Sequence, residues 1–231
     1  MKNLVEYISE SYEYTHNLSK SEQDWVNYNK GKSEVQPKTK NKVQSKSKKE
    51  LIKIINSSFE KGVYDLNFID TSKITDMSWL FENVKHNFDV SDWDVSNVKD
   101  MTGMFYCCKN FDCDLSNWNV SNVTDMYSMF TACENFKGKG IENWDVSNVT
   151  DMRYMFYNCK NFNCDLSNWD MSNALRINEM FYGCKNFEGK GLENWKLEKT
   201  LFYYNIFAGC DKVKLPSWYK AFLKRCNLEF V

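Results

Sequence analysis

A motif of 25 or 26 residues repeats through most of the chain, and it constrains the fold more than any other feature. A phenylalanine marks each copy, a few residues before a cysteine, at Phe105, Phe130, Phe156, Phe181 and Phe207. The tryptophans follow the same spacing, at Trp93, Trp118, Trp144, Trp169 and Trp195. A fixed period of this length is typical of a solenoid, in which each copy packs only against its neighbours.

The spacing within one copy predicts its local structure. Met126, Met129 and Phe130 have the spacing of one apolar helical face, and Thr124 and Asp125 before them are suited to cap a helix. The stretch 114–118 favours a short strand, paired in parallel with its equivalents. The predicted fold class is therefore α/β, a leucine-rich-repeat-like solenoid of about six coils of 25 or 26 residues, each a short strand plus a short helix, with helical caps.

Composition changes along the chain indicate its organisation. Residues 1–47 are predicted to form a flexible, polar, lysine-rich tether, in which 1–16 favour a short helix. The capped repeat solenoid follows over 48–231. Within it we expect an amino-terminal cap over 48–63, coils over 64–211 and a carboxy-terminal cap over 212–231.

Equivalent side chains of successive copies are expected to stack on one another. Phenylalanine would then stack on phenylalanine and tryptophan on tryptophan. A column of asparagines would satisfy backbone groups inside turns, at Asn97, Asn122, Asn148 and Asn173. Five of the nine cysteines form one column, so we expect reduced, packed thiols.

Alternative roles for the repeated polar residues remain open at this stage. Stacked aspartates could hold calcium, in a column of Asp76, Asp100, Asp125 and Asp151 or in one of Asp94, Asp145 and Asp170. The cysteines lack the close pairs that zinc prefers, and Cys108 with Cys133 could form a disulfide in an oxidising compartment. We expect no cofactor and no enzyme activity, because only His16 and His86 are present and no catalytic motif is found.

Charge and hydropathy bear on the partners. The formal net charge is −1, and no aromatic residue is interleaved in the lysine-rich stretch, so we expect no nucleic acid partner. No run approaches the roughly 20 apolar residues that span a bilayer, so we expect no membrane insertion. Acidic residues lie where a secretory apolar segment would be, so no signal peptide is expected in the first residues.

Two strings carry a family resemblance, WDVSNVTDMRYMFYNC at 144–159 and NFNCDLSNW at 161–169. They resemble BspA-like leucine-rich-repeat surface proteins, and more narrowly the mycoplasma-type lipoprotein repeat of unknown function. The resemblance covers roughly residues 64–211. It implies a leucine-rich-repeat-like solenoid, display at the cell surface and adhesion to host or bacterial partners, although no lipid-anchor cysteine is recognisable near the start.

The predicted function is non-enzymatic recognition of a protein, or of a glycan, through an extended solenoid surface. The alternative is a structural component of a virion or cell envelope that docks through the amino-terminal segment. Residues between the apolar anchors are the candidate contacts, and we expect them to be exposed: Thr102, Gly103, Tyr127, Ser128, Arg153, Tyr154, Asn178 and Glu179. The strand-lined face is the alternative contact surface, because leucine-rich repeats usually bind there.

Overall fold

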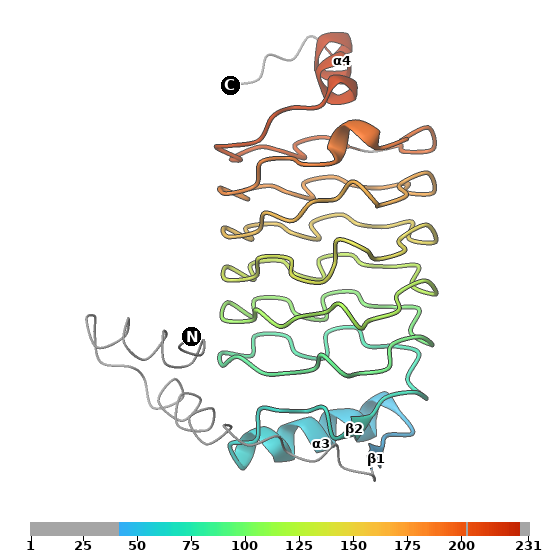
Figure 1. Cartoon of the computed structure of the whole chain (residues 1–231), viewed down its shortest axis with the longest axis vertical. Coiled ribbons are helices and arrows are strands. Elements are labelled where there is room, and N and C mark those ends of the chain that lie inside the picture. Colours follow the sequence, from blue (N-terminus) through green and yellow to red (C-terminus); the bar gives the residue numbers. More distant parts are fainter. Residues whose placement is uncertain (1–41, 202, 227–231) are drawn as a thin grey trace, which may run out of the picture.

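The computed structural model describes residues 42–201 and 203–226. Figure 1 shows the repeats as flattened loops laid over one another along the long axis, with one α-helix at each end of the stack. The regular elements in chain order are β1 (Val43–Gln44), α3 (Lys48–Glu60), β2 (Ile69–Asp70), the 3₁₀ helix η1 (Leu192–Asn194) and α4 (Ser217–Arg225). The short helix expected over 1–16, and the part of the expected 1–47 tether that covers 1–41, lie outside the described residues.

The predicted fold class is wrong. The described part of the chain has two short α-helices, one 3₁₀ helix and two short parallel strands, and most of it consists of turns and loops. An α/β, leucine-rich-repeat-like solenoid of six coils, each with a strand and a helix, is therefore not what this chain forms. Neither the helix expected after Thr124 nor the strand expected over 114–118 is present, since both stretches are built of turns.

Backbone hydrogen bonds hold successive repeats together without continuous strands. Isolated parallel bridges join one residue of each repeat to the next, in the series Asp76, Asp100, Asp125, Asp151 and Arg176. We call the segment that begins at each of these residues a layer, and number its positions from that residue. The N–H groups of positions 2, 4, 6 and 8 donate to carbonyls of positions 1, 3, 5 and 7 in the next layer, as from Gly103 to Tyr127 at 2.7 Å and from Phe105 to Met129 at 2.9 Å.

The remaining N–H groups of this segment close turns within the layer. Met104 donates to the carbonyl of Met101 at 3.1 Å, and Tyr106 donates to that of Gly103 at 3.0 Å. Buried backbone groups are therefore paired although the segment is neither helix nor sheet. Positive φ angles make this geometry, because position 4 (for example Ser128, φ 54°) and position 8 (for example Ala132, φ 57°) are left-handed. A left-handed residue every four positions ends any right-handed helix before it completes one turn.

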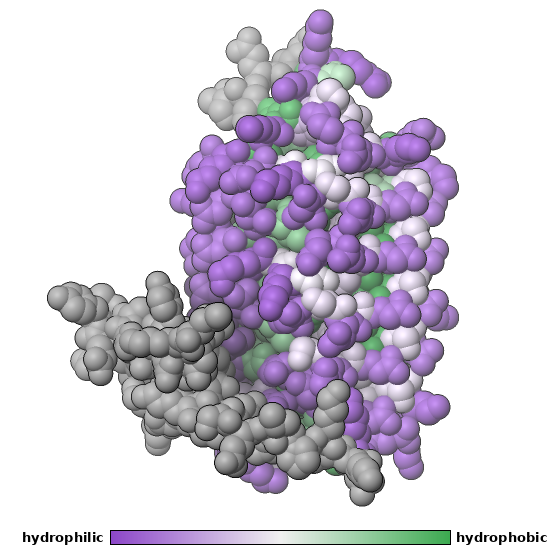
Figure 2. All heavy atoms as spheres, viewed as in Figure 1, coloured by the Kyte–Doolittle hydropathy of each residue, from purple (hydrophilic) through white to green (hydrophobic). Residues whose placement is uncertain are grey.

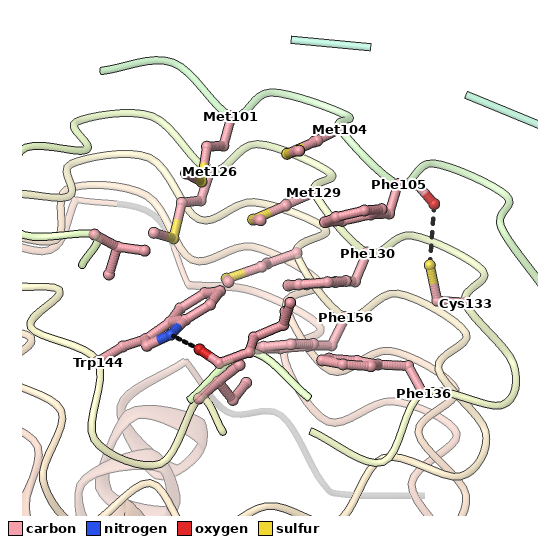
Figure 3. Packing of buried hydrophobic residues seen from close by; sticks show 14 of the residues in the cluster. Met101, Met104, Phe105, Met126, Met129, Phe130, Cys133, Phe136, Trp144 and Phe156 are labelled. Atoms are coloured by element: carbon pink, nitrogen blue, oxygen red, sulfur yellow. Dashed lines mark hydrogen bonds between the residues drawn. The ribbon is translucent and has the colours of Figure 1, made fainter. Parts of the chain in front are cut away.

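The core is a set of stacked side-chain columns, as predicted. Phe130 lies parallel to Phe105 with ring centroids 5.3 Å apart, and Phe156 lies parallel to Phe130 at 5.7 Å (Figure 3). Phe136 stacks on Phe130 from within the same repeat, at 4.3 Å. The methionines at positions 2 and 5 fill the adjacent space, and all of these side chains are buried. Offset aromatic pairs add about 0.5–1.5 kcal/mol each beyond the burial of their area.

The tryptophan and asparagine columns carry side-chain hydrogen bonds between repeats. The indole N–H of Trp144 donates to the carbonyl of Leu115 at 3.3 Å, and its ring lies parallel to that of Trp118. The amide of Asn122 donates to the carbonyl of Ser96 at 2.7 Å, and the other asparagines of the column make the equivalent bond. The predicted asparagine ladder is thus confirmed, and it pairs backbone carbonyls that no strand reaches.

Helices cover the two ends of the stack (Figure 1). α3 begins after Ser47, whose side chain accepts a hydrogen bond from the N–H of Glu50, and it buries Leu51 and Ile55. α4 buries Tyr219 and stacks Trp218 on Trp195 with centroids 6.4 Å apart. Both helices lie in segments whose apolar spacing predicts a helix. Residues 43–44, within the expected tether, instead form β1, which pairs in parallel with β2.

Candidate functional site

The predicted contact residues occupy two adjacent positions of successive layers. Position 3 contains Thr102, Tyr127, Arg153 and Asn178, and position 4 contains Gly103, Ser128, Tyr154 and Glu179. The N–H of each position-4 residue donates to the carbonyl of position 3 in the next layer, for example from Ser128 to Arg153 at 2.9 Å and from Tyr154 to Asn178 at 3.1 Å. The structure therefore brings all of these residues into two neighbouring rows.

These two rows contain both buried and half-buried residues. The expected exposure is wrong for Gly103, which is buried, and for Ser128 and Asn178, which are each only 4% exposed; these three residues cannot form much of a contact surface. Thr102, Tyr127, Arg153, Tyr154 and Glu179 are half-buried. Side chains of this second group have one part packed on the stack and another part open to a partner.

Aromatic side chains that the sequence analysis missed extend the two rows into a larger surface. Tyr154 contacts Tyr127 and Tyr157 with centroids 5.7 and 5.9 Å apart, and Tyr157 stacks on Tyr182 at 4.8 Å. Trp79 contacts Tyr106 at 5.5 Å in the first two layers. We call this surface the aromatic face, and its members are Trp79, Tyr106, Tyr127, Tyr154, Tyr157 and Tyr182. The recurrence of tyrosine two residues before the column cysteine was the available signal for three of them.

Figure 2 shows that the surface is organised in rows. Side chains of similar hydropathy lie above one another along the long axis, so rows of hydrophilic residues alternate with rows of intermediate hydropathy. Each row continues through several layers because each layer repeats the turn geometry of the one before it. The rows on this face are therefore extended along the stack.

Trp79 is held in a defined position on the aromatic face. It is 42% exposed and has a left-handed backbone, with φ of 54°. Its six-membered ring lies directly over Gly103, where an added Cβ would be 2.4 to 2.7 Å from three ring atoms. A bulky residue with positive φ is uncommon and strained. Glycine in the next layer leaves the space that this ring needs.

Charged groups border the aromatic rings. Asp151, whose carboxylate is almost fully buried, pairs with Arg153 at 2.6 Å and with Arg176 at 2.7 Å. Burial opposes ionisation of Asp151, but hydrogen bonds from the Arg153 side chain and backbone outweigh it and hold the pKa below its usual range. The Arg153 guanidinium also lies over the Tyr127 ring, 5.0 Å from its centroid. An aspartate and a tyrosine thus hold one cation together.

The cysteine column is structural. The thiol of Cys108 donates to the carbonyl of Phe81 at 2.9 Å, and burial raises its pKa to about 12. Cys108 and Cys133 are both free thiols, so the disulfide considered from the sequence is not formed. Such protonated thiols are poor nucleophiles and poor metal ligands.

The aspartate columns are engaged in turns. Asp94 accepts hydrogen bonds from the N–H and the hydroxyl of Ser96, and Asp125 accepts one from the N–H of Tyr127. Over residues 42–201 and 203–226, no three side chains of histidine, cysteine, aspartate or glutamate gather as a metal-binding group. No helix in those same ranges is both long enough and apolar enough to cross a bilayer.

Stacked turns with two groups of contacting aromatic side chains, Trp79 with Tyr106 and Tyr127 through Tyr182, define a repeat protein. A family model described as "Mycoplasma protein of unknown function, DUF285" matches residues 51–140 and 135–218. The chain therefore belongs to this family. Comparison with curated proteins and with solved structures gives no significant match.

Proposed function

We propose that this protein is a non-enzymatic recognition module that binds a protein partner through the aromatic face. The observation that carries the proposal is the continuous contact from Tyr127 through Tyr154 and Tyr157 to Tyr182, with Arg153 over the first ring. Tyrosine, tryptophan and arginine dominate the binding energy of protein interfaces. Tyrosine supplies a large contact area with little loss of side-chain entropy.

The rigidity of the backbone beneath these rings supports the same proposal. Tyr154 and Ser128 are each anchored by an N–H bond to the next layer, and the neighbouring core side chains are fully buried. A surface that is already ordered loses little conformational entropy when it binds. The relation of this family's repeats to BspA-like surface proteins favours adhesion at a cell surface as the setting.

The test uses the full chain and its Tyr127→Ala/Tyr154→Ala variant. Partners captured from an extract of the native source are identified, purified and titrated against both proteins. We expect the variant to bind at least about 30-fold more weakly, because two hot-spot truncations remove about 2 kcal/mol or more.

Lys190→Ala is the matched control, because this exposed lysine lies outside the aromatic face and its nearest carboxylate in the described part of the chain is 3.8 Å away. It should leave the affinity unchanged. Equal affinity of the tyrosine variant and the control for the purified partner would refute binding through the aromatic face. Capture of glycans in place of proteins, with the same loss in the tyrosine variant, would assign the face to glycan recognition.

A further inference from the structure

The aspartates at position 1 form one row beside the aromatic face, and the chain neutralises only part of it. Asp76 pairs with Lys48 at 2.9 Å. Asp151 pairs with Arg153 and Arg176. Cations of the chain itself therefore neutralise the position-1 carboxylates of the first and fourth layers.

In the second and third layers, Asp100 and Asp125 accept hydrogen bonds from uncharged groups. Asp100 accepts a hydrogen bond from the N–H of Thr102 at 2.8 Å. Asp125 accepts bonds from the N–H of Tyr127 at 2.9 Å and from the Thr102 hydroxyl at 3.1 Å. No lysine or arginine among residues 42–201 and 203–226 forms an ion pair with either carboxylate, and both aspartates are half-buried. Each ionised carboxylate accepts at about four lone-pair sites, so acceptor capacity remains.

The fourth layer shows how a cation fits this arrangement. The Arg153 guanidinium binds Asp151 through three contacts of 2.6 to 3.1 Å and simultaneously covers the Tyr127 ring. In the second layer the equivalent of Arg153 is the short Thr102. Trp79 and Tyr106 supply rings there, and neither has a cation of this chain over it among the described residues.

The open acceptor sites of Asp100 and Asp125 are matched by a partner rich in N–H donors. Arginine and lysine side chains carry five and three donors and no acceptor, respectively.

We propose that the aromatic face takes a basic polypeptide segment, with an arginine or lysine side chain against Asp100 and Asp125 and the flanking chain on the rings of Trp79 and Tyr106. This inference rests on the proposed function and names the partner's chemistry. Charge complementarity favours a basic partner over a neutral glycan or an acidic partner. A neutral glycan would shield two carboxylates from water without a counter-charge, and an acidic partner would be repelled.

The probe is a synthetic peptide of alternating arginine and glycine, titrated against the full chain by fluorescence anisotropy at about physiological ionic strength. A peptide with glutamine in place of arginine is the charge control. The test variants are Asp100→Asn/Asp125→Asn and Trp79→Ala. Asparagine keeps the turn acceptor, since Asn119 accepts the Ser121 N–H at 3.1 Å in this chain.

We expect the aspartate variant to bind the arginine peptide about 5- to 10-fold more weakly, and Trp79→Ala about 3- to 5-fold more weakly, from the usual size of exposed ion pairs and cation–π contacts. Asp145→Asn removes a carboxylate charge from an exposed turn outside the face, where Asp145 accepts, among the described residues, only the N–H of Ser147. This control should bind like the wild type, and the glutamine peptide should bind weakly to every variant. Circular dichroism would show that each variant is folded.

Equal loss in Asp145→Asn and in Asp100→Asn/Asp125→Asn would overturn the proposal, because binding would then follow overall charge. Absence of arginine-peptide binding at about millimolar concentration would overturn it as well. A neutral glycan that binds the wild type and loses affinity in Trp79→Ala, but not in the aspartate variant, would reject the basic partner while recognition through the aromatic face survives.

Discussion

The thiol of Cys133 donates a hydrogen bond to the backbone carbonyl of Phe105 in the preceding layer, with 3.0 Å between sulfur and oxygen (Figure 3). The same bond recurs along the column, from Cys159 to Phe130, from Cys184 to Phe156 and from Cys210 to Phe181. These cysteines are buried, so each one joins two layers while remaining a protonated thiol. The column is therefore part of the packing.

Thiol labelling tests this role. In the native protein we expect a thiol reagent to modify Cys226, which is exposed, and to leave Cys108 and Cys133 unmodified. Burial raises the pKa of the Cys108 thiol to about 12, so little reactive thiolate is present at neutral pH. Mass spectrometry of labelled peptides, with and without denaturant, measures the difference. Rapid labelling of Cys133 in the native state would contradict the packed arrangement.

Truncation of a stacked indole should be costly. Trp144 is buried against Trp118 and donates to the carbonyl of Leu115, so Trp144→Ala should lower the free energy of unfolding by about 3–5 kcal/mol. Because each layer contacts only its neighbours, unfolding should also separate into two steps. Urea denaturation followed by circular dichroism measures both effects. A single sharp transition would argue against nearest-neighbour coupling, and Trp79→Ala, at an exposed position, should shift stability little.

Two glycines with positive φ provide a matched pair. Gly140 has φ of 92°, and a Cβ there would lie 2.2 Å from the backbone nitrogen of Ser116. Gly62 has φ of 71°, with no atom of the described residues within 4 Å of such a Cβ. Gly62→Ala should cost about 1–2 kcal/mol from backbone strain alone. Gly140→Ala should cost clearly more, since backbone atoms of the preceding repeat would have to move. Similar melting temperatures for the two variants would count against this tight contact.

Protonation of His86 should weaken the attachment of α3. The ring of His86 lies 4.4 Å from both Phe59 of α3 and Tyr64, and its Nε2 is buried with no hydrogen-bond partner among the described residues. Burial lowers the pKa of His86, with no charged group contributing to the shift. The unfolded chain therefore binds the proton more readily than the folded one, and stability present above pH 6.5 falls as the pH drops through that value.

Thermal unfolding between about pH 7.5 and pH 5.5 measures this effect. The wild type should lose stability over that range, and a His86→Leu variant should lose less. Carboxylates titrate at lower pH, so they contribute little within this window. Identical pH profiles for the two proteins would remove His86 as the cause.

The sequence was sufficient to predict the repeat and its columns, because identical side chains at a fixed period can be buried together only by stacking. The backbone conformation predicted from the sequence was wrong. The spacing of Met126, Met129 and Phe130 suits a helix, but a run of turns with a left-handed residue every four positions presents the same residues to the core. The available signal for the left-handed positions was Gly103 at position 4 and Asn83 and Gly183 at position 8, because glycine and asparagine tolerate positive φ.

The candidate site was recovered in part for a related reason. Tyr127, Arg153 and Tyr154 are adjacent in the repeat, so reasoning from the variable positions between apolar anchors found them. Tyr106, Tyr157 and Tyr182 lie at position 7, three or four positions further on, and only the turn geometry carries their rings onto the same face. The pairing of Asp151 with Arg176 depends on register between layers, which no spacing within one repeat specifies.

Within positions 1 to 8, the backbone hydrogen bonds from the N–H groups of positions 2, 4, 6 and 8 all run to the carbonyls of the next layer. Elsewhere in the repeat the direction is reversed, as from the N–H of Thr124 to the carbonyl of Lys99 and from the N–H of Asn135 to that of Lys109. Each layer therefore presents a fixed order of donors and acceptors to the layer on either side. A copied repeat can be inserted only in the orientation of the existing ones, and each such insertion extends the surface rows by one layer.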